Sequence, residues 1–187
     1  MSEPTMEGED RVLVDQAQAG YKRAFDELVR RYEKPIYYLA LRYVREEQAA
    51  ADLAQTAFIK AYEGLHGFRR QASFKTWLYR IAINLCKNYL RDQGKKRVDS
   101  LGEMDPPSTA NPLRELIEHE EQWRLARAWN RLPEKQRLTV ALKVQEGMKY
   151  REISEVMGSS VGTVKANFHH ACMRLRAMLQ EGRDEMP

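Results

Sequence analysis

The chain has 187 residues, 31% of them charged, and a formal net charge of +4, so it can form one domain of ordinary size or two small ones. Glycine (10 residues) and proline (7 residues) are sparse and runs of β-branched residues are few, which favours an all-α protein. The two cysteines, Cys86 and Cys172, lie far apart and outside any Cys/His cluster, so neither a disulfide framework nor a zinc site is supported.

The first ten residues, MSEPTMEGED, are polar and acidic, and no apolar run approaches the length of a membrane span. We therefore expect no membrane insertion and a location in the reducing cytoplasm. The sequence pI of about 9.0 is compatible with nucleic-acid binding but does not by itself establish it.

Apolar residues at helical spacing predict three helices before residue 66. The first is short and ends at Gly20, the second covers residues 24–44, and the third covers residues 47–65. Pro35 lies inside the second helix, where it should bend the helix or split it in two.

Residues 67–97 form a basic island in this part of the chain. The flanking residues 1–66 and 98–131 are acidic, each with a balance of −3, whereas the island has one acid, Asp92, and a balance of +8. A basic island inside an acidic chain suggests a polyanion as partner. Its cations are Arg69, Arg70, Lys75, Arg80, Lys87, Arg91, Lys95, Lys96 and Arg97.

The island contains a predicted helix that begins after Ser73, whose hydroxyl can cap it, while residues 67–72 have no helical period and indicate a loop. An apolar stripe expected in the core consists of Phe74, Trp77, Leu78, Ile81, Ala82 and Leu85. The opposite stripe consists of Thr76, Arg80, Asn84, Lys87 and Arg91. A solvated surface normally mixes charges of both signs, and this face does not.

A segment rich in Gly, Pro, Ser and Asp follows at residues 94–112. Its nineteen residues are long for a loop inside one compact domain, so a domain boundary is the better account. We therefore expect an all-α protein with two small helical domains, residues 11–93 and 113–187, joined by this flexible linker. Residues 1–10 are expected to be a disordered lead-in.

The second half is predicted to be helical over residues 113–132 and 134–145, with Gly147 after the second helix. Residues 150–157 then form a short amphipathic helix, Gly158 ends it in a left-handed conformation, and Ser160 caps another helix. Two helices joined by a turn of about three residues are typical of a helix-turn-helix.

In a DNA-binding helix-turn-helix the N-terminal half of the second helix enters the major groove. Asn can pair with adenine there, and Lys can reach guanine acceptors or phosphates. A helical hairpin that only packs remains the alternative on this pattern alone. The outward residues are Thr163, Lys165, Ala166, Asn167, His169 and His170.

No catalytic constellation is visible, because Ser, His and Asp residues lack the spacing of a triad and there is no Gly-rich phosphate loop. His169 and His170 are adjacent and therefore point to different helix faces, which argues against a metal site. We expect a binding protein without enzymatic activity and without a cofactor.

Four stretches, residues 25–44, 52–65, 68–97 and 132–171, occur in an order and with an acidic linker that together are highly specific. On them the chain resembles a bacterial RNA polymerase sigma factor of the extracytoplasmic-function (ECF) class. The resemblance implies three partners: core RNA polymerase, promoter DNA and an anti-sigma factor. The alternative is a helix-turn-helix regulator that acts without polymerase, which should bind duplex DNA tightly alone and have no polymerase-binding surface.

The resemblance implies that the helix beginning at Asp52 docks on the clamp region of the polymerase's largest subunit. The family usually has an acidic residue just before Asp52 and another after Gln55, where this chain has Ala51 and Thr56. These differences imply a weaker or altered affinity for core polymerase. The contact residues implied are Asp52, Leu53, Gln55, Thr56 and Ile59.

The resemblance further implies that residues 67–73 and the basic helix recognise the −10 promoter element as melted single strand, with an extruded base in a pocket near Phe68 and Asn84. Aromatic walls hold an unstacked base, Asn can recognise its edge, and cations offset the backbone charge. The −10 residues implied are Phe68, Arg69, Arg80, Asn84, Lys87, Asn88 and Arg91.

The C-terminal domain is implied to recognise the −35 element as duplex. Family members often carry Ser-Arg at the positions of Ala166 and Asn167, and Arg at that of His170, so we expect an atypical −35 element. The −35 residues implied are Thr163, Lys165, Ala166, Asn167 and His170.

Overall fold

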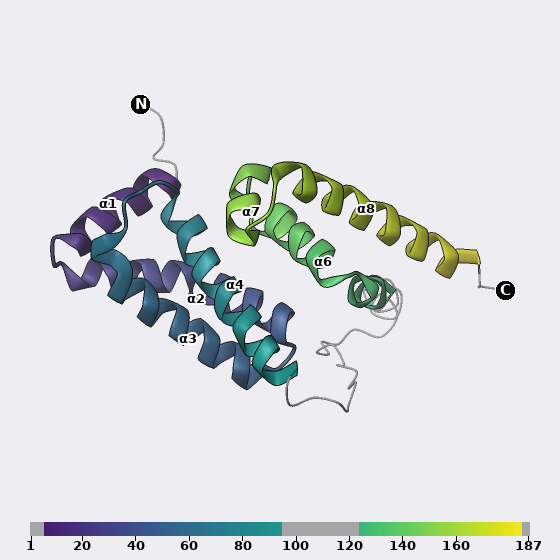
Figure 1. The fold of residues 1–187 in the computed structure, drawn as a ribbon, viewed down its shortest axis with the longest axis horizontal. Coiled ribbons are helices and arrows are strands. Elements are labelled where there is room, and N and C mark those ends of the chain that lie inside the picture. The colour runs from purple at the N-terminus through teal and green to yellow at the C-terminus, as the bar shows by residue number, and fades with distance from the viewer. Residues whose placement is uncertain (1–5, 95–123, 185–187) are drawn as a thin grey trace, which may run out of the picture. The chain divides into compact units, whose positions relative to one another are not determined.

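The computed structural model describes residues 6–94 and 124–184, and within these ranges every regular element is helical, which confirms the all-α prediction (Figure 1). Before residue 95 the elements are α1 (Met6–Gln18), α2 (Lys22–Val44), α3 (Glu47–Gly64), the 3₁₀ turn η1 (Leu65–Gly67) and α4 (Phe74–Gly94). After residue 123 they are the helical residues 124–131, α6 (Glu134–Val140), the π-helical turn η2 (Ala141–Gln145), α7 (Tyr150–Met157) and α8 (Val161–Asp184).

The chain divides into two compact units: the first contains α1–α4 together with residues 151–158, and the second contains α6, η2 and α8. Almost all of the predicted linker, from residue 95 to residue 112, lies outside the described residues, as does the start of the helix predicted over residues 113–132. The exact domain boundaries therefore stay a prediction.

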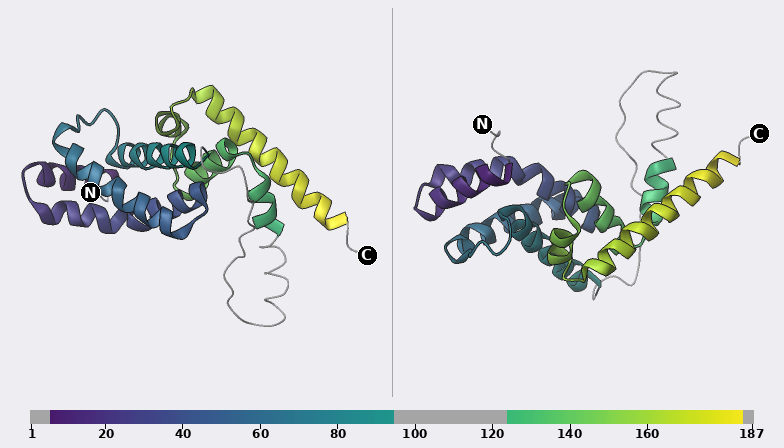
Figure 2. Two further views of the ribbon diagram at one scale, coloured as in Figure 1. Left: turned by 60° about the horizontal axis from the view of Figure 1, so that its bottom comes forward. Right: turned by 90° about the horizontal axis from the view of Figure 1, so that it is seen from above.

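The first unit has its core between α2, α3 and α4. The inward face of α3 consists of Ala50, Ala54, Phe58 and Ala61, which are all buried. Three of these four are alanines, whose small side chains let α2 and α4 pack closely against α3. Each of α2, α3 and α4 packs against the other two, and α1 lies alongside α2 (Figure 2).

Helix α2 runs without interruption through Pro35, so the helix is not split there. Proline removes one backbone hydrogen bond of a helix, but its fixed φ is a helical one. Tyr32 and Ile36, on either side of it, are 3% and 0% exposed. Burial on both sides of Pro35 stabilises the continuous helix more than the missing hydrogen bond destabilises it.

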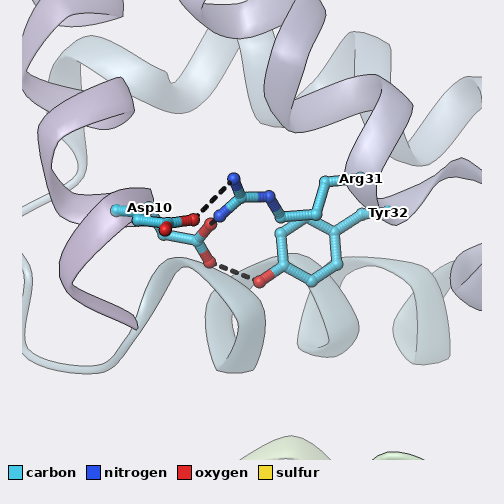
Figure 3. Close-up of polar contacts among 4 residues, drawn as sticks. Asp10, Arg31 and Tyr32 are labelled. Atoms are coloured by element: carbon cyan, nitrogen blue, oxygen red, sulfur yellow. Dashed lines mark hydrogen bonds and ion pairs between the residues drawn. The ribbon is translucent and has the colours of Figure 1, made fainter. Parts of the chain in front are cut away.

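Helix α1 begins at Met6, so the expectation of a disordered lead-in is wrong for residues 6–10. The reason is Asp10, which is only 4% exposed and accepts hydrogen bonds from two residues of α2 (Figure 3). Arg31 donates to its carboxylate at 2.6 Å, and the hydroxyl of Tyr32 donates to the other oxygen. Arg31 also donates to Glu9 at 3.0 Å, so the guanidinium joins the two helices through two acids.

The charges around Arg31 reinforce this contact. Burial by itself lowers the pKa of Arg31, but the charge of Asp10, its hydrogen bond and the charge of Glu9 raise that pKa above its ordinary value. A buried carboxylate that loses its partner is destabilising by about 3–5 kcal/mol. The start of α1 is therefore fixed to α2 by electrostatics rather than by an apolar stripe.

The second unit has a small core of Leu132, Val140 and Ala171, covered by Trp129 and Phe168. The predicted helix over residues 134–145 is present, but its last turn is π-helical. Gly147 follows with φ +66°, the left-handed conformation expected after a helix end.

The helix-turn-helix pattern is confirmed in its local structure. Gly158 follows α7 with φ +65°, and Ser160 caps α8 by accepting the backbone N–H of Thr163 at 3.1 Å. The neighbouring Ser159 differs, because its hydroxyl is buried without a hydrogen-bond partner among the described residues.

This difference gives a matched test of the turn. Ser160→Ala should lower the free energy of unfolding by about 1 kcal/mol, because it removes the cap. Ser159→Ala should cost nothing or stabilise slightly, because it removes an unsatisfied buried hydroxyl. Thermal and urea unfolding followed by circular dichroism measure both; equal losses in the two variants would contradict the capping role.

Candidate nucleic-acid interface

The exposed face of α4 is polar and cationic, as predicted, with one correction. Thr76, placed by the sequence on this face, is only 2% exposed. Its hydroxyl lies 2.9 Å from that of Ser73, whose oxygen also accepts the Thr76 backbone N–H at 3.1 Å. The cap thus satisfies Thr76 and allows it to be buried. The remaining predicted residues are all exposed: Arg80, Asn84, Lys87, Asn88 and Arg91.

The predicted apolar stripe of α4 is confirmed at Phe74, Leu78 and Ala82, which are buried, whereas Trp77, Ile81 and Leu85 are half-buried. Tyr79, Ile83 and Cys86, which the stripe did not include, are each 0% exposed. The buried face is wider than one stripe because α4 packs against both α2 and α3. Half-buried apolar side chains are thereby left next to the exposed polar face.

The residues between η1 and α4, 68–73, are here called the Phe68 loop. The Phe68 ring stacks on the Trp77 indole, with centroids 4.7 Å apart and an interplanar angle of 26°, and meets Phe74 edge-on at 6.4 Å. The Trp77 indole also lies close to Gly64, where an added Cβ would be 3.2 Å from the indole ring. Phe68 and Trp77 thus form a half-buried aromatic stack at the start of α4.

Asn84 shares a helix face with this stack but does not adjoin it. Asn84 follows Trp77 by seven positions, which corresponds to about two turns and about 10.5 Å along the helix axis. Ile81 lies between them on the same face and is half-buried. Phe68 and Asn84 are therefore the two ends of one strip with an apolar floor, longer than the single pocket that the sequence suggested.

The Phe68 loop is also bonded to α1, which sequence reasoning missed. Arg70 has φ +57°, unusual for a residue other than glycine, and its guanidinium pairs with Asp15 and donates to the side-chain oxygen of Gln18 at 3.0 Å. Gln18 in turn donates to the carbonyl oxygens of Leu65 and Phe68. Arg70, counted as one cation of the basic island, is therefore engaged within the protein, while Arg69 is exposed.

The outer face of α3 carries a second group of predicted residues. Asp52, Gln55 and Ile59 are exposed, and Leu53 and Thr56 are half-buried. The Thr56 hydroxyl donates to the backbone carbonyl of Asp52 at 2.7 Å, so it is already satisfied within the helix.

Ile59 is not alone on this face. It is 51% exposed, and Tyr62, one turn further along, is 48% exposed and rests edge-on against Phe25 at 5.0 Å between centroids. Sequence reasoning missed Tyr62, although an aromatic residue three positions after an exposed isoleucine is a usable signal. The two side chains form an apolar patch beside polar Asp52 and Gln55.

The first three turns of α8 hold the third group. Thr163, Lys165, Ala166 and His170 are exposed, and Asn167 is half-buried. Lys165 is the one residue of these five that carries a fixed positive charge.

Lys165 is positioned by an aromatic ring. Its Nζ lies 5.9 Å from the centroid of Tyr150, which also contacts the Nζ of Lys143 at 5.0 Å. Phe168 meets the same ring edge-on at 5.9 Å. The contact with Tyr150 holds the ammonium group of Lys165 on one side of α8.

Two further observations concern other kinds of site. The rings of His169 and His170 lie 6.0 Å apart, and no group of three or more metal-ligating side chains occurs among the described residues. None of the helices within residues 6–94 and 124–184 combines the length and the apolar character that a membrane span requires.

Comparison with known proteins assigns both halves of the chain to sigma-70 factors. The model of sigma-70 region 2 matches residues 28–96 and that of sigma-70 region 4 matches residues 122–175. The chain is 38% identical to the RNA polymerase sigma-H factor of Pseudomonas aeruginosa over 182 residues, 92% of this chain and 94% of the relative. It is 37% identical to the ECF RNA polymerase sigma-E factor of Escherichia coli K12 over 172 residues, 87% and 90% of the two chains.

A solved structure is similar in fold over nearly the whole chain. It is that of CnrH in complex with the cytosolic domain of CnrY, with a TM-score of 0.69 and 26% identity. The similarity covers 92% of this chain and 98% of the other.

Proposed function

Because the chain belongs to the ECF class of bacterial RNA polymerase sigma factors, we propose that it binds core RNA polymerase, recognises promoter −10 and −35 elements, promotes strand opening and so initiates transcription of a specific set of genes. This proposal rests mainly on the exposed cationic face of α4, which has the Phe68–Trp77 stack at its start. A factor of core polymerase acts in the cytoplasm, where we place this chain.

The strip on α4 is proposed to bind the melted −10 strand. An unstacked base needs an aromatic or apolar surface, and Phe68, Trp77 and Ile81 supply a half-buried one. Asn84, at the other end of the strip, has the donors and the acceptor to recognise a base edge. Arg69, Arg80, Lys87, Asn88 and Arg91 surround the strip and contact the phosphates.

The outer face of α3 is proposed to dock on the clamp region of the largest polymerase subunit. Protein interfaces gain most of their binding energy from a few large side chains at their centre. Ile59 and Tyr62 are such side chains, and Asp52, Gln55 and the half-buried Leu53 flank them. Thr56, whose hydroxyl is satisfied internally, contributes shape rather than charge.

The start of α8 is proposed to enter the major groove of the −35 duplex. Lys165, directed by Tyr150, contacts a phosphate or a guanine acceptor, and the half-buried Asn167 approaches an adenine. Thr163, Ala166 and His170 complete the surface. With only one fixed cation among these five residues, base contacts and DNA shape weigh more than phosphate attraction.

An anti-sigma factor is proposed as a further partner, since the similar protein CnrH is solved with the cytosolic domain of CnrY. Such a partner would cover the Ile59–Tyr62 patch, which is too apolar to be a purely solvated surface. A polymerase-independent helix-turn-helix regulator is not favoured, because such a protein has no use for the α3 patch or the α4 strip.

The polymerase-binding role of α3 has a matched test. Ile59→Ala should weaken binding to core polymerase about tenfold, because a central apolar contact is lost. Val12→Ala is the control: it removes two carbons, where Ile59→Ala removes three, from a side chain of α1 that is 55% exposed, against 51% for Ile59, and it should leave binding unchanged. Fluorescence titration of labelled protein with core, followed by run-off transcription, measures both.

The assignment fails if the wild-type chain does not bind core or support run-off transcription. It also fails if the chain binds promoter duplex tightly without core.

The two DNA-binding roles are separable. In holoenzyme, Asn84→Ala should reduce open-complex formation selectively on particular −10 variants and leave −35 duplex affinity intact. Lys165→Ala should weaken the −35 contact and reduce the slope of log affinity against log salt by about 1. Arg176→Ala is the control, since Arg176 is an exposed cation on nearly the same face of α8, about three turns further on. Unchanged promoter choice and unchanged opening in both Asn84→Ala and Lys165→Ala would contradict this map.

A further inference from the structure

The Phe68–Trp77 stack, which is proposed to bind a base, depends on the Phe68 loop. This loop lies between helices, so helix formation does not fix its conformation. Phe68 lies between η1 and α4, with φ −72° and ψ +105°. A flexible loop that orders only on binding loses affinity and selectivity, because ordering consumes part of the interaction free energy. The loop therefore needs a contact that orders it before DNA arrives.

Gln18, in the last turn of α1, makes that contact with one side-chain amide. Its nitrogen donates to the carbonyl oxygen of Leu65 at 2.8 Å and to that of Phe68 at 3.2 Å. Its oxygen accepts from the guanidinium of Arg70 at 3.0 Å. Carbonyls only accept and guanidinium only donates, so the network fixes which way the amide faces.

The backbone of Phe68 is thereby held on both sides. Its N–H donates to Leu65 at 3.1 Å, and its carbonyl accepts from Gln18. With the backbone fixed, the ring lies on Trp77 rather than turning into solvent.

The left-handed conformation of Arg70 is held by the same helix. For a residue other than glycine this conformation persists only where neighbouring contacts enforce it. The contacts are the ion pair with Asp15 and the hydrogen bond to Gln18, both on α1. Two residues one turn apart on α1 therefore hold the loop at two points.

We propose that Gln18 is a positioning residue, which orders the Phe68 loop in its base-binding conformation and so sets the selectivity and rate of −10 opening without touching the DNA. This inference rests on the proposed role of Phe68 in binding the −10 strand. It gives α1 a function in promoter recognition through the loop.

The test uses holoenzyme on promoters with a fluorescent base analogue in the −10 element. Gln18→Met keeps the size and helix propensity of the side chain but removes all three hydrogen bonds. It should reduce opening discrimination between preferred and substituted −10 elements on the order of tenfold, with −35 duplex affinity unchanged. The control is Gln16→Met, the same change at an exposed position two residues earlier on α1. It should change neither the opening discrimination nor the −35 duplex affinity.

A second variant separates positioning from folding. Gln18→Glu keeps an acceptor for Arg70 but cannot donate to the two carbonyls. It should therefore lose discrimination as Gln18→Met does while its melting temperature stays that of the wild type. Retained discrimination in both folded variants would overturn the inference.

Phe68→Ala distinguishes failure of the inference from failure of the proposed function. If Phe68→Ala leaves opening and discrimination unchanged, the −10 role of Phe68 itself is wrong. If Phe68→Ala impairs them and the Gln18 variants do not, only the positioning role is wrong. In the double variant the losses should not add, because Gln18 acts through Phe68; additive losses would show that Gln18 acts by another route.

Discussion

The buried carboxylate of Asp10 joins the start of α1 to α2 in the first unit. A charge that is 4% exposed is stable only with its partners, and these come from α2 through Arg31 and Tyr32. The pair fixes the start of α1, and the end of the same helix bonds to the Phe68 loop through Gln18. Tyr32 also packs on Phe74, which meets the Phe68 ring, so the Asp10 contact supports the aromatic stack at the edge of the cationic face.

The first unit combines an ordered aromatic stack with exposed positive charge on α4. The Phe68–Trp77 stack is fixed from the backbone side and the ring side, whereas the exposed Arg80 side chain on α4 can follow a flexible strand. Fixed apolar surfaces give selectivity among bases, and mobile cations give affinity that depends on salt. In α8 the balance differs, because Lys165 is directed by Tyr150 and the residues around it are uncharged.

The helices, the Ser73 and Ser160 caps and the left-handed Gly158 could be predicted, because each depends on residues close in sequence. The buried side of α4 was predicted only in part, at Phe74, Leu78 and Ala82, since a helix that packs on two neighbours has a wider core face than one stripe. Thr76 is also buried, with its hydroxyl satisfied. Residues 6–10 and Gln18 could not be found, because their partners are distant in sequence and leave no periodic pattern. The predicted contacts to DNA and polymerase remain predictions that the exposure of their side chains supports.

Amide hydrogen exchange in the full chain tests most directly whether the Asp10 contact orders the Phe68 loop. The Phe68 amide, bonded to Leu65, should be protected in the wild type and should exchange about tenfold faster or more in Asp10→Asn. The Val164 amide, bonded to Ser160 in the other unit, should exchange at the same rate in both proteins. An unprotected Phe68 amide in the wild type, or an exchange rate unaffected by Asp10→Asn, would contradict the account.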